Sequence, residues 1–199
     1  MHRMKKINEI FYSLQGEGHN TGTPAVFIRF SGCNLQCSFC DTDHTYGTQM
    51  SDEQIIAEVK RYPQAQLIVL TGGEPSLFID SAFITVLKHA TGATIAIETN
   101  GTNPLPPELD WVTLSPKTGM PGGDNAPLAI NECNELKVVY VGQPLEQYFS
   151  IKASHYYLQP CASGNIVNDR LNTKATIDAV LADPRWTLSL QTHKLLGIR

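Results

Sequence analysis

The sequence lacks any apolar run that approaches the roughly 20 residues needed to cross a bilayer as a helix. Its N-terminal segment is basic but has no apolar stretch of the kind found in a signal peptide. Cysteine is scarce, with five in 199 residues, and an odd number fits poorly with a secreted disulfide framework. These absences predict a cytoplasmic protein that associates with no membrane.

Charge is also sparse. Charged residues make up 17% of the chain, the formal net charge is −4, and no run of Lys and Arg exceeds Lys5-Lys6. Binding to nucleic acid usually requires a basic surface, so no nucleic-acid partner is expected. The 42% of hydrophobic residues is enough for a packed core. No linker or change of composition divides the chain, which predicts a single domain over residues 1–199.

Apolar, strand-like segments alternate with helical patterns along the chain. This alternation predicts an α/β fold with a mostly parallel, curved sheet of six or seven core strands. A complete eightfold barrel typically needs about 250 residues, so a partial barrel is expected. The expected strands are 24–32, 67–73, 93–101, 111–117, 135–141, 155–160 and 186–193, and the expected helices are 51–62, 81–90 and 173–183.

Polar or glycine-rich segments follow five of these strands. They are SGC, TGGEP, ETNGT, LSPK and LQPC. In parallel α/β sheets, ligands bind beyond the carboxyl ends of the strands. The five segments are therefore expected to converge on one face and to form a ligand site there.

Three of the five cysteines crowd into one short segment. Cys33, Cys37 and Cys40 have the spacing C-x3-C-x2-C, and the other two lie far away in the sequence. A structural zinc site normally closes with four protein ligands. Zinc with His44 as the fourth ligand is one interpretation of the segment. The other is a four-iron cluster held by three thiolates, which leaves one iron open to a substrate or cofactor.

This cysteine motif, with Phe39 before its last member, resembles the signature of radical S-adenosylmethionine (SAM) enzymes, and TGGEP (71–75) resembles their second motif. A narrower resemblance, to the 7-carboxy-7-deazaguanine synthase family, extends over the chain. It rests on EIFYSLQGEG (9–18), PAVFIRFSGCNLQCSFCDTDHTYG (24–47), LTGGEPSL (70–77), IETNGT (97–102), LSPK (114–117), LQP (158–160) and LQTHKLLGIR (190–199).

The resemblance implies an abbreviated radical-SAM barrel and a carbon–nitrogen lyase. The enzyme would contract the ring of 6-carboxy-5,6,7,8-tetrahydropterin to 7-carboxy-7-deazaguanine with loss of ammonia, in the synthesis of queuosine and other 7-deazapurines. The implied cofactors are a [4Fe-4S] cluster, SAM and Mg²⁺. The implied partners are the pterin, a second copy of the chain and an electron donor such as flavodoxin. A deoxyadenosyl radical would take a hydrogen atom from the pterin and later return it, which regenerates SAM.

The resemblance also implies ligands, and no separate catalytic side chain is assigned. Cys33, Cys37 and Cys40 would hold the cluster. Thr42 would bind Mg²⁺, together with substrate and water oxygens, because one neutral oxygen cannot hold this ion alone. SAM would contact Phe39, Cys40, Asp41, Gly73, Ser115, Pro116, Lys117, Gln159, Pro160, Cys161 and Ala162. The substrate would contact Leu14, Gln15, Gly16, Arg29, Thr71 and the C-terminal Arg199.

Residue chemistry supports parts of this assignment. Gly73 has no Cβ, so its backbone can approach a ligand closely. The planar fork of Arg29 suits a carboxylate, although a surface salt bridge is the alternative. Two other functions stay open. One is another small radical SAM enzyme, such as a glycyl-radical activase, and the other is a non-enzymatic zinc-binding module.

Overall fold

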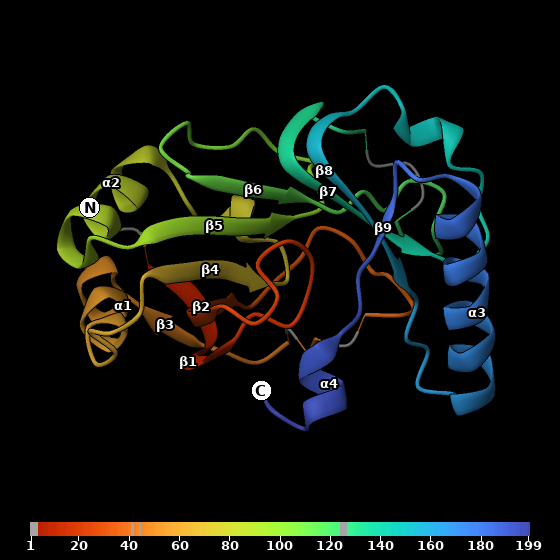
Figure 1. The fold of residues 1–199 in the computed structure, drawn as a ribbon. Coiled ribbons are helices and arrows are strands. Elements are labelled where there is room, and N and C mark those ends of the chain that lie inside the picture. Colours follow the sequence, from red (N-terminus) through yellow and green to blue (C-terminus); the bar gives the residue numbers. More distant parts are fainter. Residues whose placement is uncertain (1–3, 41, 44, 124–126) are drawn as a thin grey trace.

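The computed structural model describes residues 4–40, 42–43, 45–123 and 127–199. Their strands form one nine-stranded sheet in the order β3-β1-β2-β4-β5-β6-β7-β8-β9 (Figure 1). The strands are β1 (Lys5–Leu14), β2 (Pro24–Phe30), β3 (Thr48–Met50), β4 (Leu67–Gly72), β5 (Thr94–Thr99), β6 (Trp111–Leu114), β7 (Glu132–Tyr140), β8 (Lys152–Pro160) and β9 (Thr187–Leu188).

Among the described strands, neighbours are parallel in the order β2-β4-β5-β6-β7-β8-β9, whereas β1 pairs antiparallel with both β2 and β3. The helices are α1 (Asp52–Val59), α2 (Ser81–Thr91), α3 (Ile166–Ala182) and α4 (Thr192–Leu196), with short 3-10 turns η1 (Pro75–Leu77) and η2 (Glu146–Tyr148). Within the described residues, the crossovers from β5 to β6 and from β6 to β7 contain no helix. The expected abbreviated barrel with a mostly parallel sheet is therefore confirmed.

The main core lies on the outer face of the sheet. Val26, Ile28 and Phe30 alternate along β2 and pack with the outer residues of β4 and β5 against α1 and α2. These two helices lie together at one end of the molecule, and α3 lies at the other (Figure 1). The sequence specifies α1 locally, because Ser51 and Gln54 form the expected capping box.

The inner face carries the intervening residues of the same strands. A small apolar cluster there includes Phe27 of β2, Val69 of β4 and Ala96 of β5. Successive side chains of a strand point to opposite faces, so the residue two positions further along each strand also faces inward. That residue is polar in all three strands, namely Arg29, Thr71 and Glu98. Strand periodicity thus places a polar group at the inner carboxyl end of each strand.

Several elements differ from the sequence-based expectation, and the short strand β3 is one that was not expected. The first strand, β1, was not expected, because polar residues interrupt its apolar pattern. Helix α3 begins at Ile166, earlier than predicted, where Asn165 accepts hydrogen bonds from two backbone N–H groups of the first turn. The strand expected at 186–193 is only two residues long and is followed by α4.

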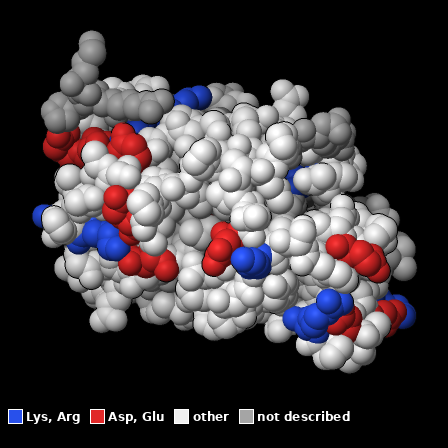
Figure 2. Space-filling view, turned by 90° about the horizontal axis from the view of Figure 1, so that it is seen from above, with Lys and Arg blue, Asp and Glu red and all other residues white. Residues whose placement is uncertain are grey.

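The surface shows both signs of charge. On the face in Figure 2, some Lys and Arg side chains lie beside Asp and Glu and others lie apart from them, and much of this face is uncharged. No helix among the described residues is both long enough and apolar enough to cross a membrane.

Candidate active site

A cavity of about 640 Å³ lies where the strands of the inner face end. A volume of this size is typical of small-molecule sites. The expected convergence of the five strand-end segments is confirmed, since residues from each of them line this cavity. Pro116 is buried and does not line it, and Asp41 lies outside the described residues, as does His44. The other predicted site residues line it: Leu14, Gln15, Gly16, Arg29, Cys33, Cys37, Phe39, Cys40, Thr42, Thr71, Gly73, Ser115, Lys117, Gln159, Pro160, Cys161, Ala162 and Arg199.

The loop that carries the three cysteines rests on a glycine-rich loop after β6. The backbone N–H of Gln36 donates to the Gly122 carbonyl at 3.1 Å, and that of Ser38 donates to the Pro121 carbonyl at 3.2 Å. Gly122 has φ +81°, and a Cβ there would lie 1.9 Å from the Gln36 carbonyl oxygen. Both the dihedral angle and the close approach require glycine. The loop after β6 therefore fixes where the cysteines lie.

The TGGEP segment packs against the start of the cysteine loop. A Cβ on Gly73 would lie 2.0 Å from the Gly32 carbonyl oxygen, so glycine is required here as well. The buried carboxylate of Glu74 accepts from the Thr99 hydroxyl at 2.7 Å and from the Asn100 backbone N–H at 2.7 Å. Glu74 thereby joins the ends of β4 and β5, and its negative charge is met by protein donors.

Two further segments line the side of the cavity formed by β6 and β8. The ammonium of Lys117 donates to the carbonyl and the hydroxyl of Ser115, both at 2.7 Å, and burial lowers the pKa of Lys117. Gln159 accepts from the Ser189 hydroxyl at 2.9 Å, which fixes the amide at the end of β8. The side chain of Cys161 is buried.

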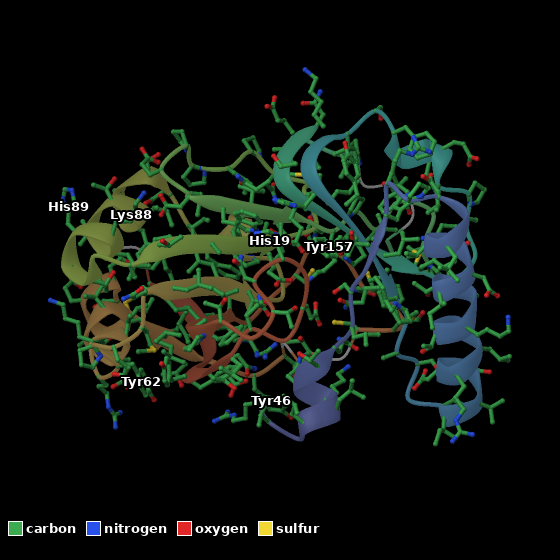
Figure 3. All side chains as sticks on the ribbon, viewed as in Figure 1. His19, Tyr46, Tyr62, Lys88, His89 and Tyr157 are labelled. Atoms are coloured by element: carbon green, nitrogen blue, oxygen red, sulfur yellow. The ribbon has the colours of Figure 1, made fainter. Side chains whose placement is uncertain are left out.

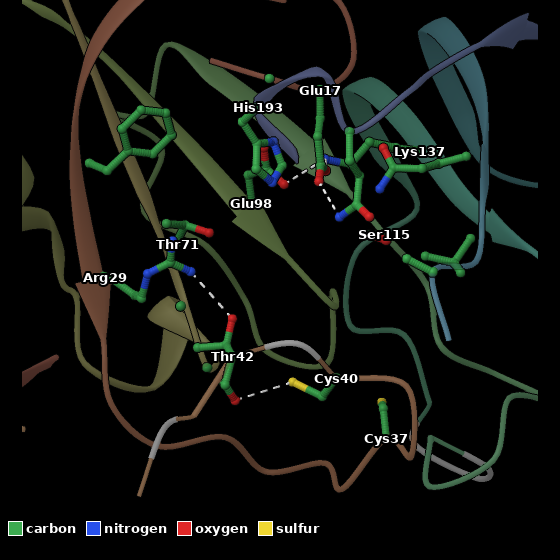
Figure 4. Close-up of a pocket in the computed structure, with 18 of the residues that line it drawn as sticks. Glu17, Arg29, Cys37, Cys40, Thr42, Thr71, Glu98, Ser115, Lys137 and His193 are labelled. Carbon is green, nitrogen blue, oxygen red and sulfur yellow. Dashed lines mark hydrogen bonds and ion pairs between the residues drawn. The ribbon is translucent and has the colours of Figure 1, made fainter. Parts of the chain in front are cut away.

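Arg29 stands at the opposite side of the cavity, beside Thr42 (Figure 4). Its Nε donates to Glu9 Oε1 at 2.9 Å, and its Nη1 donates to the Thr42 hydroxyl at 3.3 Å. The guanidinium also lies 5.7 Å from the centre of the Phe11 ring. Arg29 does form a salt bridge, but within the cavity wall, where a guanidinium is available to an anionic ligand.

A buried ion cluster forms the floor of the cavity. Lys137 Nζ lies 2.5 Å from Glu17 Oε2 and 2.6 Å from Glu98 Oε2. Burial opposes ionisation of Glu17, yet the Lys137 ammonium and the Gln191 amide hold its pKa down at about 2. Burial likewise opposes the charge of Lys137, but the carboxylates outweigh it and raise the pKa of Lys137 above its ordinary value. At neutral pH Glu17 is therefore a carboxylate and Lys137 an ammonium, and Glu98 lies beside the same ammonium. The amide of Gln15 completes it by donating to Glu98 Oε1 at 2.9 Å.

Aromatic stacking fixes the loop that holds Glu17. The ring of His19 lies 4.9 Å from that of Trp111 and 4.1 Å from that of His155. Figure 3 shows His19 near the middle of the sheet, whereas Lys88 and His89 lie at the far end of α2. Gln15 closes the same loop, because its backbone N–H donates to the Thr23 carbonyl at 2.8 Å.

The arrangement of the thiols suits a cluster. None of the five cysteines, all of which lie in the described part of the chain, forms a disulfide. Within the described part of the chain, no three His, Cys, Asp or Glu side chains are placed to share one metal ion. In a four-iron cluster each thiolate binds a different iron, so the thiols need not converge on a single ion. The donor set thus fits a [4Fe-4S] cluster with one iron left to a ligand other than a protein thiolate.

Comparison with known proteins agrees with this site. Residues 27–120 match the model of the Radical SAM superfamily. The chain is 58% identical to 7-carboxy-7-deazaguanine synthase of Bacteroides thetaiotaomicron, over 98% of this chain and 100% of the relative. It is 40% identical to the enzyme of that name from Burkholderia multivorans, over 96% and 98% of the two chains. The crystal structure of QueE from Escherichia coli superposes with a TM-score of 0.77 at 30% identity, over 95% and 94%.

The cysteine loop, the TGGEP turn and the partial barrel together define a radical SAM enzyme. Within that class, the chain belongs to the 7-carboxy-7-deazaguanine synthase family. Its cofactors are those of the family, a [4Fe-4S] cluster, SAM and Mg²⁺.

Sequence reasoning did not single out two residues of the floor. Glu98 belongs to ETNGT, which the sequence marks only as the polar end of a strand. Lys137 lies inside an apolar strand. The alternation of β7, in which Leu136 and Val138 pack on the outer core, was the one available sign that Lys137 faces inward.

Proposed function

We propose that this chain contracts the ring of 6-carboxy-5,6,7,8-tetrahydropterin to 7-carboxy-7-deazaguanine with loss of ammonia, in the synthesis of queuosine or another 7-deazapurine. The observation that carries the proposal is the polarity of the cavity. It has an arginine at one side, a carboxylate pair at its floor, and the cysteine loop at its edge.

The substrate has matching polarity. Its carboxylate at C6 suits Arg29, whose guanidinium can donate two parallel hydrogen bonds. The opposite edge of the pterin carries an amino group and a ring N–H, which are donors. The carboxyl oxygens of Glu17 and Glu98 are acceptors suited to that edge, and the Gln15 amide beside them can also accept. The distribution of charge thus favours one orientation of the ring.

When bound, the cofactors would supply the radical chemistry that removes a hydrogen atom from the substrate. The chain would hold and shield them. Cys33, Cys37 and Cys40 would bind three irons, and the Thr42 hydroxyl would supply one oxygen to Mg²⁺ beside Arg29. Backbone and side-chain groups of Ser115, Lys117, Gln159, Pro160, Cys161 and Ala162, with Phe39 and Gly73, would contact SAM. The apolar ring of Phe27 at the inner face would help to exclude water from the reacting centre.

Anaerobic turnover tests the proposal. Reconstituted enzyme with the tetrahydropterin, SAM, Mg²⁺ and a reductant should form 7-carboxy-7-deazaguanine without net consumption of SAM. Cys37→Ala should lose iron and turnover. Cys133→Ala is the matched control, because burial raises the pKa of the Cys133 thiol to about 12 and leaves it unreactive. Absence of the deazapurine, or full activity in Cys37→Ala, would contradict the proposal.

The two rival functions give other results in the same assay. A glycyl-radical activase would leave the pterin unchanged and would install a radical on a partner protein. A zinc-binding module would contain about one zinc ion per chain and no iron, which metal analysis would detect.

We also propose that two copies of the chain assemble through α3. The outward face of this helix exposes large apolar residues, with Val167 at 62%, Leu171 at 62% and Leu181 at 78%. Several large apolar residues exposed on one helix are typical of an interaction site. If two α3 helices pack antiparallel about Lys174, Val167 meets Leu181, Leu171 meets Ile177, and Arg170 meets Asp178 of the other copy. This self-complementary pattern favours a second copy as the partner.

Light scattering during gel filtration tests the assembly. The molar mass measured for the unaltered protein should be twice the 21.9 kDa of one chain. The molar mass of Leu171→Glu should be that of one chain. Val86→Glu, on the exposed face of α2, is the control. A dimer that survives Leu171→Glu would exclude this interface.

The cellular setting follows from the thiols and the cofactor. Five cysteines without a disulfide among them favour the reducing cytoplasm as the site of action. The cluster must receive an electron, and we propose a donor such as flavodoxin. Replacing a chemical reductant by flavodoxin and its reductase should sustain turnover.

A further inference from the structure

We infer that Glu9 is a positioning residue that holds two arginines at once. It would orient the anchor of the substrate carboxylate and fasten the end of the chain beside the cavity. The inference rests on the proposed function. Glu9 itself lines the same cavity, but it is an anion beside the group proposed to bind an anionic substrate, so its contribution must come through its neighbours.

The sheet places Glu9 against Arg29. These residues are partners in the antiparallel pair of β1 and β2, next to an irregularity of register between Ile7 and Glu9. Both side chains are 26% exposed, and Glu9 Oε1 accepts from Arg29 Nε at 2.9 Å. With Nε occupied, the Nη1 edge is directed to the Thr42 hydroxyl and the cavity (Figure 4). A carboxylate on Nε thus fixes which edge of the guanidinium a ligand meets.

The second oxygen of Glu9 is bound to the end of the chain. Glu9 Oε2 forms an ion pair with the guanidinium of Arg199. The Ser13 hydroxyl donates to the Arg199 carbonyl at 2.6 Å, and the Arg199 guanidinium lies 4.9 Å from the centre of the Phe11 ring. Phe11 is thereby shared by both arginines, at 5.7 Å from Arg29. One wall of the cavity is therefore a layer of two guanidiniums joined by one carboxylate.

Charge and geometry make opposite predictions for this layer. Counting side chains alone, two arginines and one glutamate carry one net positive charge. If only net charge mattered, Glu9→Gln would remove a repelling anion and tighten carboxylate binding. If Glu9 orients Arg29, the same variant would weaken it, because a misaligned guanidinium loses its bidentate geometry. The sign of the change therefore distinguishes the two explanations.

Equilibrium binding of two fluorescent probes provides the test. We would titrate 6-carboxypterin and unsubstituted pterin into reconstituted enzyme with SAM and Mg²⁺ but without reductant. The unaltered enzyme should prefer 6-carboxypterin. Glu9→Gln should lose about tenfold of that preference through weaker binding of 6-carboxypterin, with pterin affinity unchanged. In turnover, its KM should rise by a similar factor while kcat changes less. Glu132→Gln, an exposed glutamate of β7, is the matched control.

Arg199→Ala isolates the second contact. Its side chain is 68% exposed, so this variant should fold normally. Trypsin should cleave after Lys194 at least several-fold faster in both Glu9→Gln and Arg199→Ala, because either change frees the end of the chain. Unchanged cleavage in Arg199→Ala would overturn the fastening function even if Glu9→Gln failed to fold.

The outcomes separate the inference from the proposed function. Equal or tighter binding of 6-carboxypterin by Glu9→Gln would overturn the positioning function while leaving the ring contraction intact. If the unaltered enzyme bound neither probe and converted no tetrahydropterin, the proposed function would fail and the inference with it.

Discussion

Replacing Lys137 by methionine tests whether one buried cation holds the floor of the cavity together. Lys137 is 3% exposed and pairs with Glu17 and Glu98 at 2.5 Å and 2.6 Å. Methionine has a similar length but no charge, so the variant leaves two carboxylates facing each other with little solvent. Removing one partner of a buried ion pair typically costs about 3–5 kcal/mol. For a domain of this size that corresponds to a melting temperature lower by about 6–20 °C.

The loss of folding stability in Lys137→Met should depend on pH. In the unaltered chain, the pKa of Glu17 is lowered from 4.5 to about 2, so its stabilisation is complete above pH 4.5 and is lost as pH falls toward 2. It therefore adds no pH dependence near neutrality. In Lys137→Met, Glu17 loses the ammonium that offsets its burial, so burial raises the pKa of Glu17. The folded state then binds more protons than the unfolded state, and stability falls as pH rises.

Thermal unfolding of the reconstituted protein at about pH 5.5 and about pH 8 measures both effects. Lys137→Met should melt at a lower temperature than the unaltered chain at both values, with the larger deficit at the higher pH. Lys60→Met, at an exposed lysine after α1, controls for loss of charge alone. A deficit below about 1 kcal/mol, or one that does not grow with pH, would refute the idea of a charge-compensated floor.

Three further variants test the walls of the cavity. Gly122→Ala should lower the iron content, because its Cβ would collide with the Gln36 carbonyl. Gly119→Ala is the control, since Gly119 has a similar φ of +75° but a Cβ there makes no close contact, and this variant should bind iron normally. Arg29→Lys should raise KM for the tetrahydropterin by about tenfold or more with unchanged iron content, since an ammonium cannot reproduce the bidentate fork; an unchanged KM would argue against Arg29 as the anchor. Thr42→Val keeps the side-chain shape but removes the hydroxyl, and it should raise the Mg²⁺ concentration for half-maximal turnover by about tenfold; turnover with unaltered Mg²⁺ dependence would exclude Thr42 as a ligand.

Much of the site could be predicted from the chain alone, because local rules determine it. The alternation of β2 places Phe27 and Arg29 on one face whatever the strand pairs with. The spacing of the cysteines limits what they can bind. Parallel strands bring their carboxyl ends to one edge, so SGC and TGGEP had to meet. In each case the relevant information lies within a few consecutive residues.

The floor could not be predicted, because long-range topology determines it. Glu17, Glu98 and Lys137 come from the loop after β1, from β5 and from β7. Separately, each is an ordinary polar residue. In the sheet, only β6 lies between β5 and β7, so Glu98 and Lys137 come close together on the inner face. The loop after β1 crosses this face and brings Glu17 to them. No pattern of sequence spacing encodes that distance.

The sequence predicts only the second half of helix α3, for a different physical reason. Its apolar residues do not mark its buried side, since Thr176 is fully buried while Leu181 is 78% exposed. A periodicity argument assumes that the apolar stripe faces the core. Here apolar residues point outward, so the pattern gives no clear start, and only the last part of the helix was recognised. A second copy of the chain on that face would account for the exception.

The abbreviated barrel has a consequence for the cluster. In a full βα barrel, a helix would follow β6 and pack on the outside of the sheet. Here the described part of that crossover is a loop, and its Pro121 and Gly122 carbonyls accept hydrogen bonds from the cysteine loop. The same loop begins with Ser115 and Lys117, which line the cavity and which we propose to contact SAM. Because one loop supports both sides, a change that displaces it must alter cluster binding and SAM binding together.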